Sequence, residues 1–405
     1  MNTITRWPSI WRALLAVALA VAAITGCGGG VGTGGTGGNA TAYASGPITG
    51  FGSVIVNGVR FDDSAATTIV EDGDGGRRSR DDLRLGMTVE VDSSAISTDA
   101  NGSSATASRI RFDSEMTGLV GSVDVTGGSF TLLGQRVTVD AATVFDERLS
   151  GGLAGLALGQ AVEVYAVFDT VGGRYRATRI EQASLAGGLR LRGPLAQVDT
   201  SVQTLRVGTT PYSYAGASGI PTNLAAGQFV RLRLGLVTLP TSRWVVLSFS
   251  TALQSLADAD EAKVEGLISS FTSSSTFFVS GRPVDASTAT FPQGTAGLAA
   301  GVRVEVEGTL RSGVLRASKV SIVSDDQVRD RGFDLNGPIT AVNPALANPA
   351  LATITLRGLT VSTARSDLEY RDGTAANLVV GRNVEVKGVL AADRRTLEAT
   401  RIRFR

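Results

Sequence analysis

The sequence of 405 residues contains no histidine and a single cysteine, Cys27. These absences exclude Ser-His-Asp and Cys-His nucleophile systems, histidine-ligated metals, cysteine zinc sites and intramolecular disulfides. Only three lysines occur, Lys263, Lys319 and Lys387, so a Ser–Lys dyad has few possible members. The composition therefore removes the commonest catalytic chemistries, and we expect a protein that is not an enzyme and has no cofactor.

The chain also has little net charge and few aromatic residues. Lys and Arg number 38 against 37 Asp and Glu, and aromatic residues make up 6% of the sequence. Removing Arg6 and Arg12 with an N-terminal signal leaves 36 basic against 37 acidic side chains. A nucleic-acid-binding protein normally has a basic excess, and a stacking platform needs aromatic rings. We therefore expect no nucleic-acid partner.

Residues 1–26 have the features of a secretory signal. Two arginines precede an apolar run at residues 13–23, which is too short to span a bilayer as a permanent helix. The run ends in Ile24-Thr25-Gly26-Cys27, which resembles the lipobox of bacterial lipoproteins. The resemblance implies that Cys27 carries lipid, and Gly28 after it favours the outer membrane of the cell envelope over the inner membrane. The alternatives are an ordinary secretory peptide with an incidental cysteine or an N-terminal anchor helix.

Residues 27–45 are dominated by glycine and small polar residues. Such a stretch cannot bury enough apolar surface to fold, so it behaves as a flexible tether with a reach of about 23 Å. No Gly-Lys-Ser/Thr follows the glycines, which argues against a phosphate-binding loop. The segment is thus predicted to separate the lipid on Cys27 from the first folded unit.

The rest of the chain repeats one pattern five times. A glycine followed by apolar positions opens each copy, at intervals of 72, 75, 73 and 71 residues. Repetition at a near-fixed period indicates a duplicated structural unit. The copies, called units 1 to 5 from here on, span residues 46–112, 118–185, 189–250, 263–323 and 335–405.

Each unit is predicted to form five short strands. A glycine-marked hairpin follows the first strand, and the fourth strand alternates strictly, as in Val302-Arg303-Val304-Glu305-Val306. We therefore expect Val304, Val386 and Ile402 to be buried and Glu305, Glu385 and Arg401 to be exposed. Five short strands with the longest gap before the fourth suit a small, partly open β-barrel of OB type. An SH3-like barrel and a two-layer sandwich are the alternatives.

The pattern G-x-[IV]…G…V-x-V…L-x-x-G-x-x-V-E-V…A-x-[RK]-[IV] resembles the repeats of domain of unknown function 5666 (DUF5666), found in secreted and lipid-anchored bacterial proteins. Four units fit it well. Unit 3 departs, because its fourth strand, Val230–Leu234, lacks Glu and its last strand contains Trp244–Leu247 in place of Ala-x-Arg-Ile. The resemblance implies a fold and an envelope setting, and it supplies no activity and no catalytic residue.

Charged residues recur on the wet faces of the last two strands of the units. Glu90, Glu163, Glu305 and Glu385 lie on fourth strands, and a candidate ligand face on fifth strands comprises Arg109, Arg111, Arg179, Lys319, Arg401 and Arg403. OB-like sheets bind oligonucleotides and oligosaccharides, which favours a charged ligand face. The simpler interpretation, which we favour, is cross-strand ion pairing worth about 0.2–1 kcal/mol per pair.

The most acidic loop is a weak candidate for a metal site. Glu71, Asp72 and Asp74 could offer oxygen ligands to Ca²⁺, but the loop lacks the distal glutamate of an EF-hand and does not recur in the other units. A solvated loop is favoured, and no metal is expected. Residues 251–262 and 324–334 are predicted hinges, whereas the short linker at 113–117 predicts close packing of units 1 and 2.

Three functions are compatible with these patterns. The first is a non-enzymatic, lipid-anchored envelope protein, in the periplasm or at the cell surface, whose repeats act as a spacer or interaction scaffold. The second is a binding module for an anionic or saccharide envelope ligand on the barrel faces, and the third is an Asp/Glu-dependent hydrolase. Because contacts in a repeat array are mostly between neighbours, damage to one unit is expected to stay local.

Overall fold

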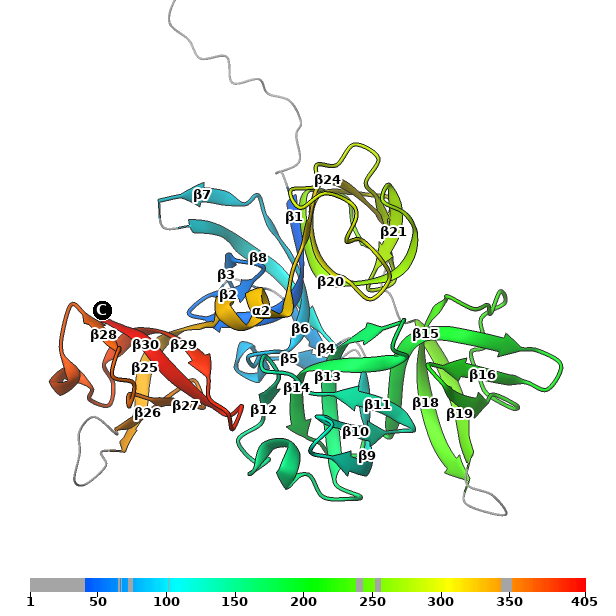
Figure 1. Cartoon of the computed structure of the whole chain (residues 1–405), viewed down its shortest axis with the longest axis horizontal. Coiled ribbons are helices and arrows are strands. Elements are labelled where there is room, and N and C mark those ends of the chain that lie inside the picture. The colour runs from blue at the N-terminus through cyan, green and yellow to red at the C-terminus, as the bar shows by residue number, and fades with distance from the viewer. Residues whose placement is uncertain are drawn as a thin grey trace, which may run out of the picture. The chain divides into compact units, whose positions relative to one another are not determined.

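The computed structural model describes residues 41–64, 66, 68–71, 76–100, 102–237, 243–251, 256–343 and 352–405. The described residues form one compact unit. Cys27, Asp72 and Asp74 lie outside the described residues, as does the tether up to residue 40. Residues 41–45, predicted to belong to the tether, instead form the start of a strand, β1 (Thr41–Phe51), because Ala42, Tyr43 and Ala44 are buried against neighbouring strands. Figure 1 shows that strands build almost all of the described chain. Within it, no helix combines the length and the apolar character needed to cross a membrane.

Unit 2 is a closed five-stranded β-barrel. Its strands are β9 (Met116–Asp124), β10 (Ser129–Leu132), β11 (Gln135–Thr138), β13 (Ala161–Asp169) and β14 (Arg174–Gln182). Antiparallel pairs join β9 to β10 and β10 to β11, and β11 then pairs in parallel with β14. The ring closes through β13, which pairs with both β14 and β9. The short β12 (Val144–Phe145) pairs with β14 beside this ring.

Unit 3 closes in the same order. It consists of β15 (Leu189–Asp199), β16 (Thr204–Val207), β17 (Thr210–Ser213), β18 (Phe229–Val237) and β19 (Arg243–Thr251). Its third and fifth strands again form the parallel pair, and β18 returns to β15. Unit 3 therefore keeps the topology of the array although its sequence departs from the shared pattern.

The same ring of pairings recurs in the other three units. Unit 1 uses β1 (Thr41–Phe51), β2 (Val54–Val56), β3 (Val59–Asp62), β6 (Thr88–Ser94) and β8 (Gly102–Phe112), with β4 (Thr68–Glu71), β5 (Gly76–Arg78) and β7 (Ser97–Asp99) added. Unit 4 uses β20 (Ala259–Ser273), β21 (Thr276–Val279), β22 (Arg282–Asp285), β23 (Arg303–Arg311) and β24 (Val314–Ile322). Unit 5 uses β25 (Phe333–Asn343), β26 (Thr353–Leu356), β27 (Leu359–Ser362), β29 (Asn383–Leu390) and β30 (Thr396–Phe404), with β28 (Glu369–Arg371) added.

This strand order, 1-2-3-5-4, is that of an OB-like Greek-key barrel and not of a two-layer sandwich. In each unit the first strand is long enough to pair with the fourth strand along one half and with the second along the other. The predicted all-β class is therefore confirmed, and the strand pairings agree with the five-stranded barrel expected for a unit.

The closing Ala-Ser/Thr-Arg/Lys-Ile/Val motif encodes a β-bulge. In unit 5 the register shifts so that Thr400 is the extra residue, and its hydroxyl donates to the carbonyl of Lys387 at 3.1 Å. Residues three apart fall on opposite faces of a regular strand, yet Ala399 and Ile402 are both fully buried. The bulge brings both into the barrel. Ser108 and Ser318 make the equivalent bonds at 3.0 and 3.1 Å in units 1 and 4.

The predicted burial pattern holds for the apolar positions. Val304, Val386 and Ile402 are completely buried. Glu305 and Glu385 are largely covered, with 15% and 13% of the side chain accessible, because cations of neighbouring segments pack over them. The alternation thus predicted the buried face correctly and overestimated the exposure of the charged face.

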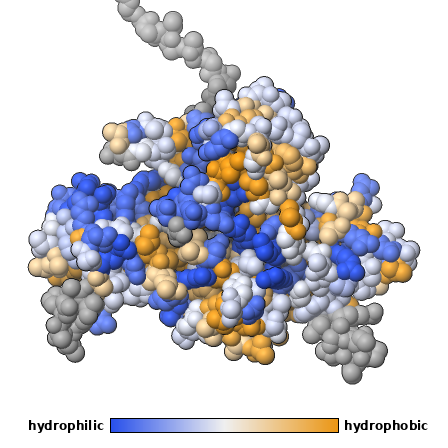
Figure 2. Space-filling view, viewed as in Figure 1, coloured by the Kyte–Doolittle hydropathy of each residue, from blue (hydrophilic) through white to orange (hydrophobic). Residues whose placement is uncertain are grey.

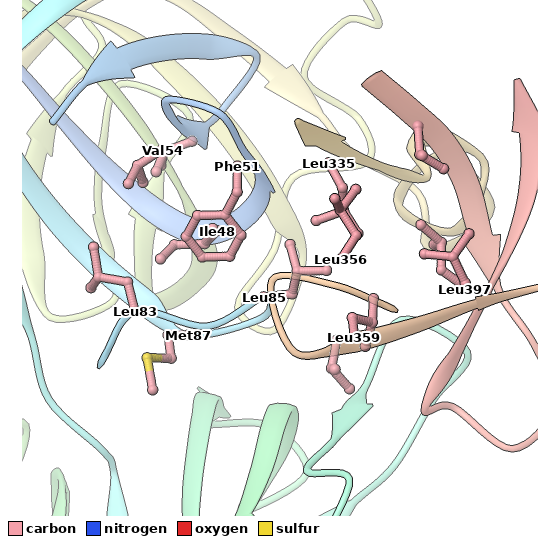
Figure 3. Packing of buried hydrophobic residues seen from close by; sticks show 14 of the residues in the cluster. Ile48, Phe51, Val54, Leu83, Leu85, Met87, Leu335, Leu356, Leu359 and Leu397 are labelled. Carbon is pink, nitrogen blue, oxygen red and sulfur yellow. The ribbon is translucent and has the colours of Figure 1, made fainter. Parts of the chain in front are cut away.

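The five units do not have five separate cores. One cluster joins units 1 and 5 and includes Val144 and Tyr165 of unit 2. A second joins units 2 and 3, and a third combines unit 4 with Tyr43 of β1. Figure 3 shows Ile48 and Phe51 of β1 facing Leu335 and Leu356 of unit 5. Parallel pairing of β1 with both β20 and β25 joins unit 1 to units 4 and 5. The expectation of mainly nearest-neighbour contacts is therefore wrong.

The predicted hinges are structured where they are described. Residues 259–262 belong to β20, and α2 (Asp325–Arg331) follows unit 4 with a capping box between Ser324 and Gln327. The acidic residues that marked these segments as flexible serve instead in strand pairing and in the first turn of α2. The close packing predicted for the 113–117 linker is confirmed, because all five of its side chains are buried.

Candidate functional site

A buried network of charges lies where units 1 to 4 meet. It surrounds a cavity of about 90 Å³, called the junction cavity, which is lined by Tyr43, Glu90, Arg111, Glu115, Arg192 and Arg282 among others. Arg282 of β22 contacts Glu90 of β6 at 2.7 Å, and Arg111 of β8 contacts the same carboxylate at 3.2 Å. These guanidiniums outweigh the effect of burial and hold the pKa of Glu90 below its ordinary value.

The linker between units 1 and 2 supplies two further buried acids. Arg192 of β15 contacts Glu115 at 2.9 Å, and Arg231 of β18 pairs with Asp113. Burial dominates here: it raises the pKa of Glu115 to about 7 and also raises that of Asp113, although the arginines oppose both shifts. Both linker carboxylates are thus held by arginines of unit 3.

This arrangement explains why unit 3 departs from the shared sequence pattern. Unit 3 has six arginines and one acidic residue, a net charge of +5. Three of them, Arg190, Arg192 and Arg231, pair with Glu163, Glu115 and Asp113 of unit 2 and the linker. The fourth strand of unit 3 has arginine where other units have glutamate because it faces an acidic linker.

A similar pair fastens α2 to unit 4. Glu265 of β20, with 3% of its side chain exposed, contacts Arg303 at 3.3 Å and also pairs with Arg331 at the end of α2. Removing one partner of a buried pair leaves an uncompensated charge and costs about 3–5 kcal/mol.

The size of the junction cavity limits what it can hold. Its volume suits a few water molecules and is far below that of a small-molecule site. Its charged side chains already form ion pairs, which connect unit 4 to unit 1 and unit 3 to the linker. The junction cavity is therefore suited to joining units and not to holding a ligand.

The candidate ligand-face residues do not form one surface. Arg111 and Arg179 are buried. Arg111 pairs with its cross-strand partner Glu90 within unit 1, and Arg179 of unit 2 donates to the carbonyl of Leu85 of unit 1 at 3.1 Å. Lys319 pairs with Glu307 at 3.2 Å, as the cross-strand interpretation predicts. Arg109 is exposed on β8. Of these six residues only Arg401 and Arg403 lie together, in a hollow of about 780 Å³ formed by unit 5 and part of unit 1.

This hollow, called the C-terminal hollow from here on, is lined mainly by cations. Its charged residues are Arg60 from unit 1 and Arg371, Asp372, Glu385, Lys387, Arg401, Arg403 and Arg405 from unit 5. Figure 2 shows hydrophilic residues gathered at the end of unit 5 where the chain ends. Unit 5 carries ten Lys and Arg against six Asp and Glu, a net charge of +4.

Sequence reasoning missed Arg60, Arg371, Lys387 and Arg405 as members of this surface. The balanced charge of the whole chain hid the basic excess of unit 5, which a count for each unit separately reveals. Arg371 could not be placed from the repeat pattern, because β28 is an addition to the five-stranded ring.

A third concave surface is apolar. Phe168, Phe229 and Phe278, from units 2, 3 and 4, line a groove of about 630 Å³ together with glycine-rich hairpins. Among the described residues no group of three or more acidic side chains is placed to hold a metal ion. Of the weak metal candidate, Glu71 is the last residue of β4, and Asp72 and Asp74 are not among the described residues.

Two solved structures are similar to parts of this chain. One is the Drosophila structure "drosophila Unr CSD456", with 14% identity, 52% of this chain and 97% of that chain covered, and a TM-score of 0.15. The other is a multidomain protein with nucleic acid binding domains from Streptococcus pneumoniae, with 9% identity, 52% and 72% coverage, and a TM-score of 0.12. Comparison with curated proteins finds no match.

The profile of the domain of unknown function DUF5666 matches residues 45–111, 117–181, 265–321 and 336–403, which is more than half of the chain. These segments correspond to units 1, 2, 4 and 5. Unit 3 is not matched, so the array contains four family repeats and not five. The chain belongs to the DUF5666 family.

Proposed function

We propose that this chain is a non-enzymatic, lipid-anchored scaffold of the cell envelope, in which five OB-like barrels hold interaction surfaces in fixed positions. The lipid anchor is inferred from the lipobox-like Ile24-Thr25-Gly26-Cys27 and from the glycine-rich tether behind it. The scaffold role is inferred from how the units are joined.

The observation that carries the proposal is the burial of charge and apolar surface between units. Shared hydrophobic clusters join units 1 and 5 and units 2 and 3, and the ion pairs of the junction cavity connect unit 1 to unit 4. In an array of independent domains joined by flexible linkers, these groups would be exposed to water. Their burial supports a body in which one unit cannot move without exposing the core of another.

The anchor is tested by replacing Cys27 with serine. The wild-type protein should fractionate with membranes, and Cys27→Ser should move it to the soluble fraction because no thiol remains to accept lipid. A matched Ser9→Ala change within the signal should leave fractionation unaltered. Mass spectrometry of the wild-type mature N-terminus should show acyl groups on Cys27, and an unmodified N-terminus would exclude lipid anchoring.

A further inference from the structure

The cations of the C-terminal hollow outnumber the carboxylates that neutralise them. Glu369 pairs with both Arg371 and Arg401, at 2.6 and 2.7 Å. Asp334 is shared in the same way by Arg60 and Lys387, at 2.7 and 3.6 Å. Glu385 pairs with Arg405 and Arg60, and Asp372 with Arg403, so six cations face four carboxylates. The hollow keeps an excess of positive charge after every ion pair is made.

Three arginines also keep unused hydrogen-bond donors. Arg371, Arg401 and Arg403 each donate to a carboxylate through Nε. Within the part of the chain that the structure describes, their Nη1 and Nη2 groups make no hydrogen bond. Between 38% and 52% of each of these side chains is exposed. A ligand in the hollow can therefore reach the terminal amino groups without breaking an existing bond.

The backbone sets the spacing of these donors. Arg401 and Arg403 are two residues apart on β30 and lie about 7 Å apart along the same face of the strand. Arg371 on β28 is the register partner of Arg403 across a parallel pair, at about 4.8 Å. Glu369 also pairs with both Arg371 and Arg401, so the three arginines are close neighbours. A ligand with more than one phosphate group can therefore contact more than one of them.

The chemistry of the hollow selects among anions. Guanidinium forks bind phosphate with paired, charge-assisted hydrogen bonds. The lining includes one aromatic residue, Phe404, which is 3% exposed and offers no ring on which a nucleic-acid base could stack.

We propose that the C-terminal hollow binds the phosphate groups of a multiply phosphorylated ligand, with Arg371, Arg401 and Arg403 as the contacting residues. The source of the phosphates is either a soluble phosphorylated compound or the headgroups of an anionic lipid surface. The proposal is independent of the scaffold function, because it needs only the geometry of unit 5 and the contact with Arg60.

The test is binding of the full chain to inositol hexakisphosphate and to phosphatidylcholine vesicles with and without phosphatidic acid. Wild-type protein should bind at least one of the phosphorylated probes, with an affinity that falls as salt rises. Arg401→Gln/Arg403→Gln should weaken binding at least tenfold. Soluble-probe binding identifies a free phosphorylated compound, and binding only to the phosphatidic acid vesicles identifies a lipid surface.

Two control variants distinguish specific binding in the C-terminal hollow from nonspecific attraction to positive charge. Arg311→Gln/Lys319→Gln removes two exposed, ion-paired cations of unit 4 and should leave binding unchanged. Arg401→Lys/Arg403→Lys keeps the charge but loses the guanidinium forks, and should weaken binding several-fold. Glu369→Gln retains all cations and should tighten binding, which reports on the site even if an arginine variant misfolds.

Three results would overturn the proposal. The first is absence of binding to every phosphorylated probe by folded wild-type protein. The second is equal weakening by the unit 4 control variant. The third is tighter binding to a single-stranded oligonucleotide of equal charge than to inositol hexakisphosphate, which would make the surface a nucleic-acid site.

Discussion

At the scale of single residues, the position of a charged side chain depends on the ion pair that it forms as well as on strand alternation. The arginines of unit 3 look like departures from a repeat pattern, and they become intelligible only beside Asp113 and Glu115 of the linker. Lys319 and Glu307 follow the cross-strand rule because their strands are neighbours within one barrel. Sequence alone predicts ion pairs within one barrel, since the register of neighbouring strands follows from the local pattern. It does not predict ion pairs between units, because these depend on how the units meet.

Glu115 gives stability a dependence on pH. Its pKa in the folded protein is about 7, above the ordinary value of 4.5, because burial disfavours the charged carboxylate. The folded state therefore binds more protons than the unfolded state, and this contribution to stability is full below pH 4.5 and is lost as pH rises through 7. Glu115→Gln should be about as stable as wild type at pH 5 and should lose less stability between pH 5 and 8. Urea denaturation at both values measures the difference, and parallel curves would contradict it.

At the scale of elements, two local rules account for most of each unit. Alternation predicts the buried valines of the fourth strand, and glycine predicts the tight turn between the second and third strands. The Ala-Ser/Thr-Arg/Lys-Ile/Val ending is a motif in the sequence, but strand alternation does not predict its bulge, since alternation places Ala399 and Ile402 on opposite faces and both are buried. The hydroxyl between them was the only signal, since Thr400 donates to the carbonyl of Lys387.

The bulge bond can be tested in unit 5. Thr400→Val keeps the shape of the side chain and removes the hydrogen bond to Lys387, so it should lower the free energy of unfolding by about 0.5–1.5 kcal/mol. Thr360→Val is a matched control on β27, because none of the described residues accepts or donates a hydrogen bond with its hydroxyl. Chemical denaturation of the two variants should separate them. Equal stability would mean that the bulge forms without help from the hydroxyl.

At the scale of the whole molecule, the repeat period does not predict how many hydrophobic cores there are or which units share them. Five similar units suggest five independent folding bodies, whereas β1 pairs with β20 and β25, and units 1 and 5 share one cluster. These contacts join residues more than 200 positions apart, so no local pattern reveals them. The five-stranded ring of each unit could be predicted from the sequence, but the added strands β4, β5, β7, β12 and β28 and the partners of each unit could not.

The shared cores predict how damage spreads. Val386 is completely buried in the cluster that joins units 1 and 5, so Val386→Asp places a charge in the hydrophobic core that these two units share. Amide hydrogen exchange should show loss of protection in residues 335–405 together with residues 41–112, while units 2 and 3 remain protected. Val164→Asp, in the cluster of units 2 and 3, should give the opposite pattern. If Val386→Asp exposed unit 5 alone, the cores of units 1 and 5 would be energetically separate, and the molecule would behave as an array of independent barrels despite its contacts.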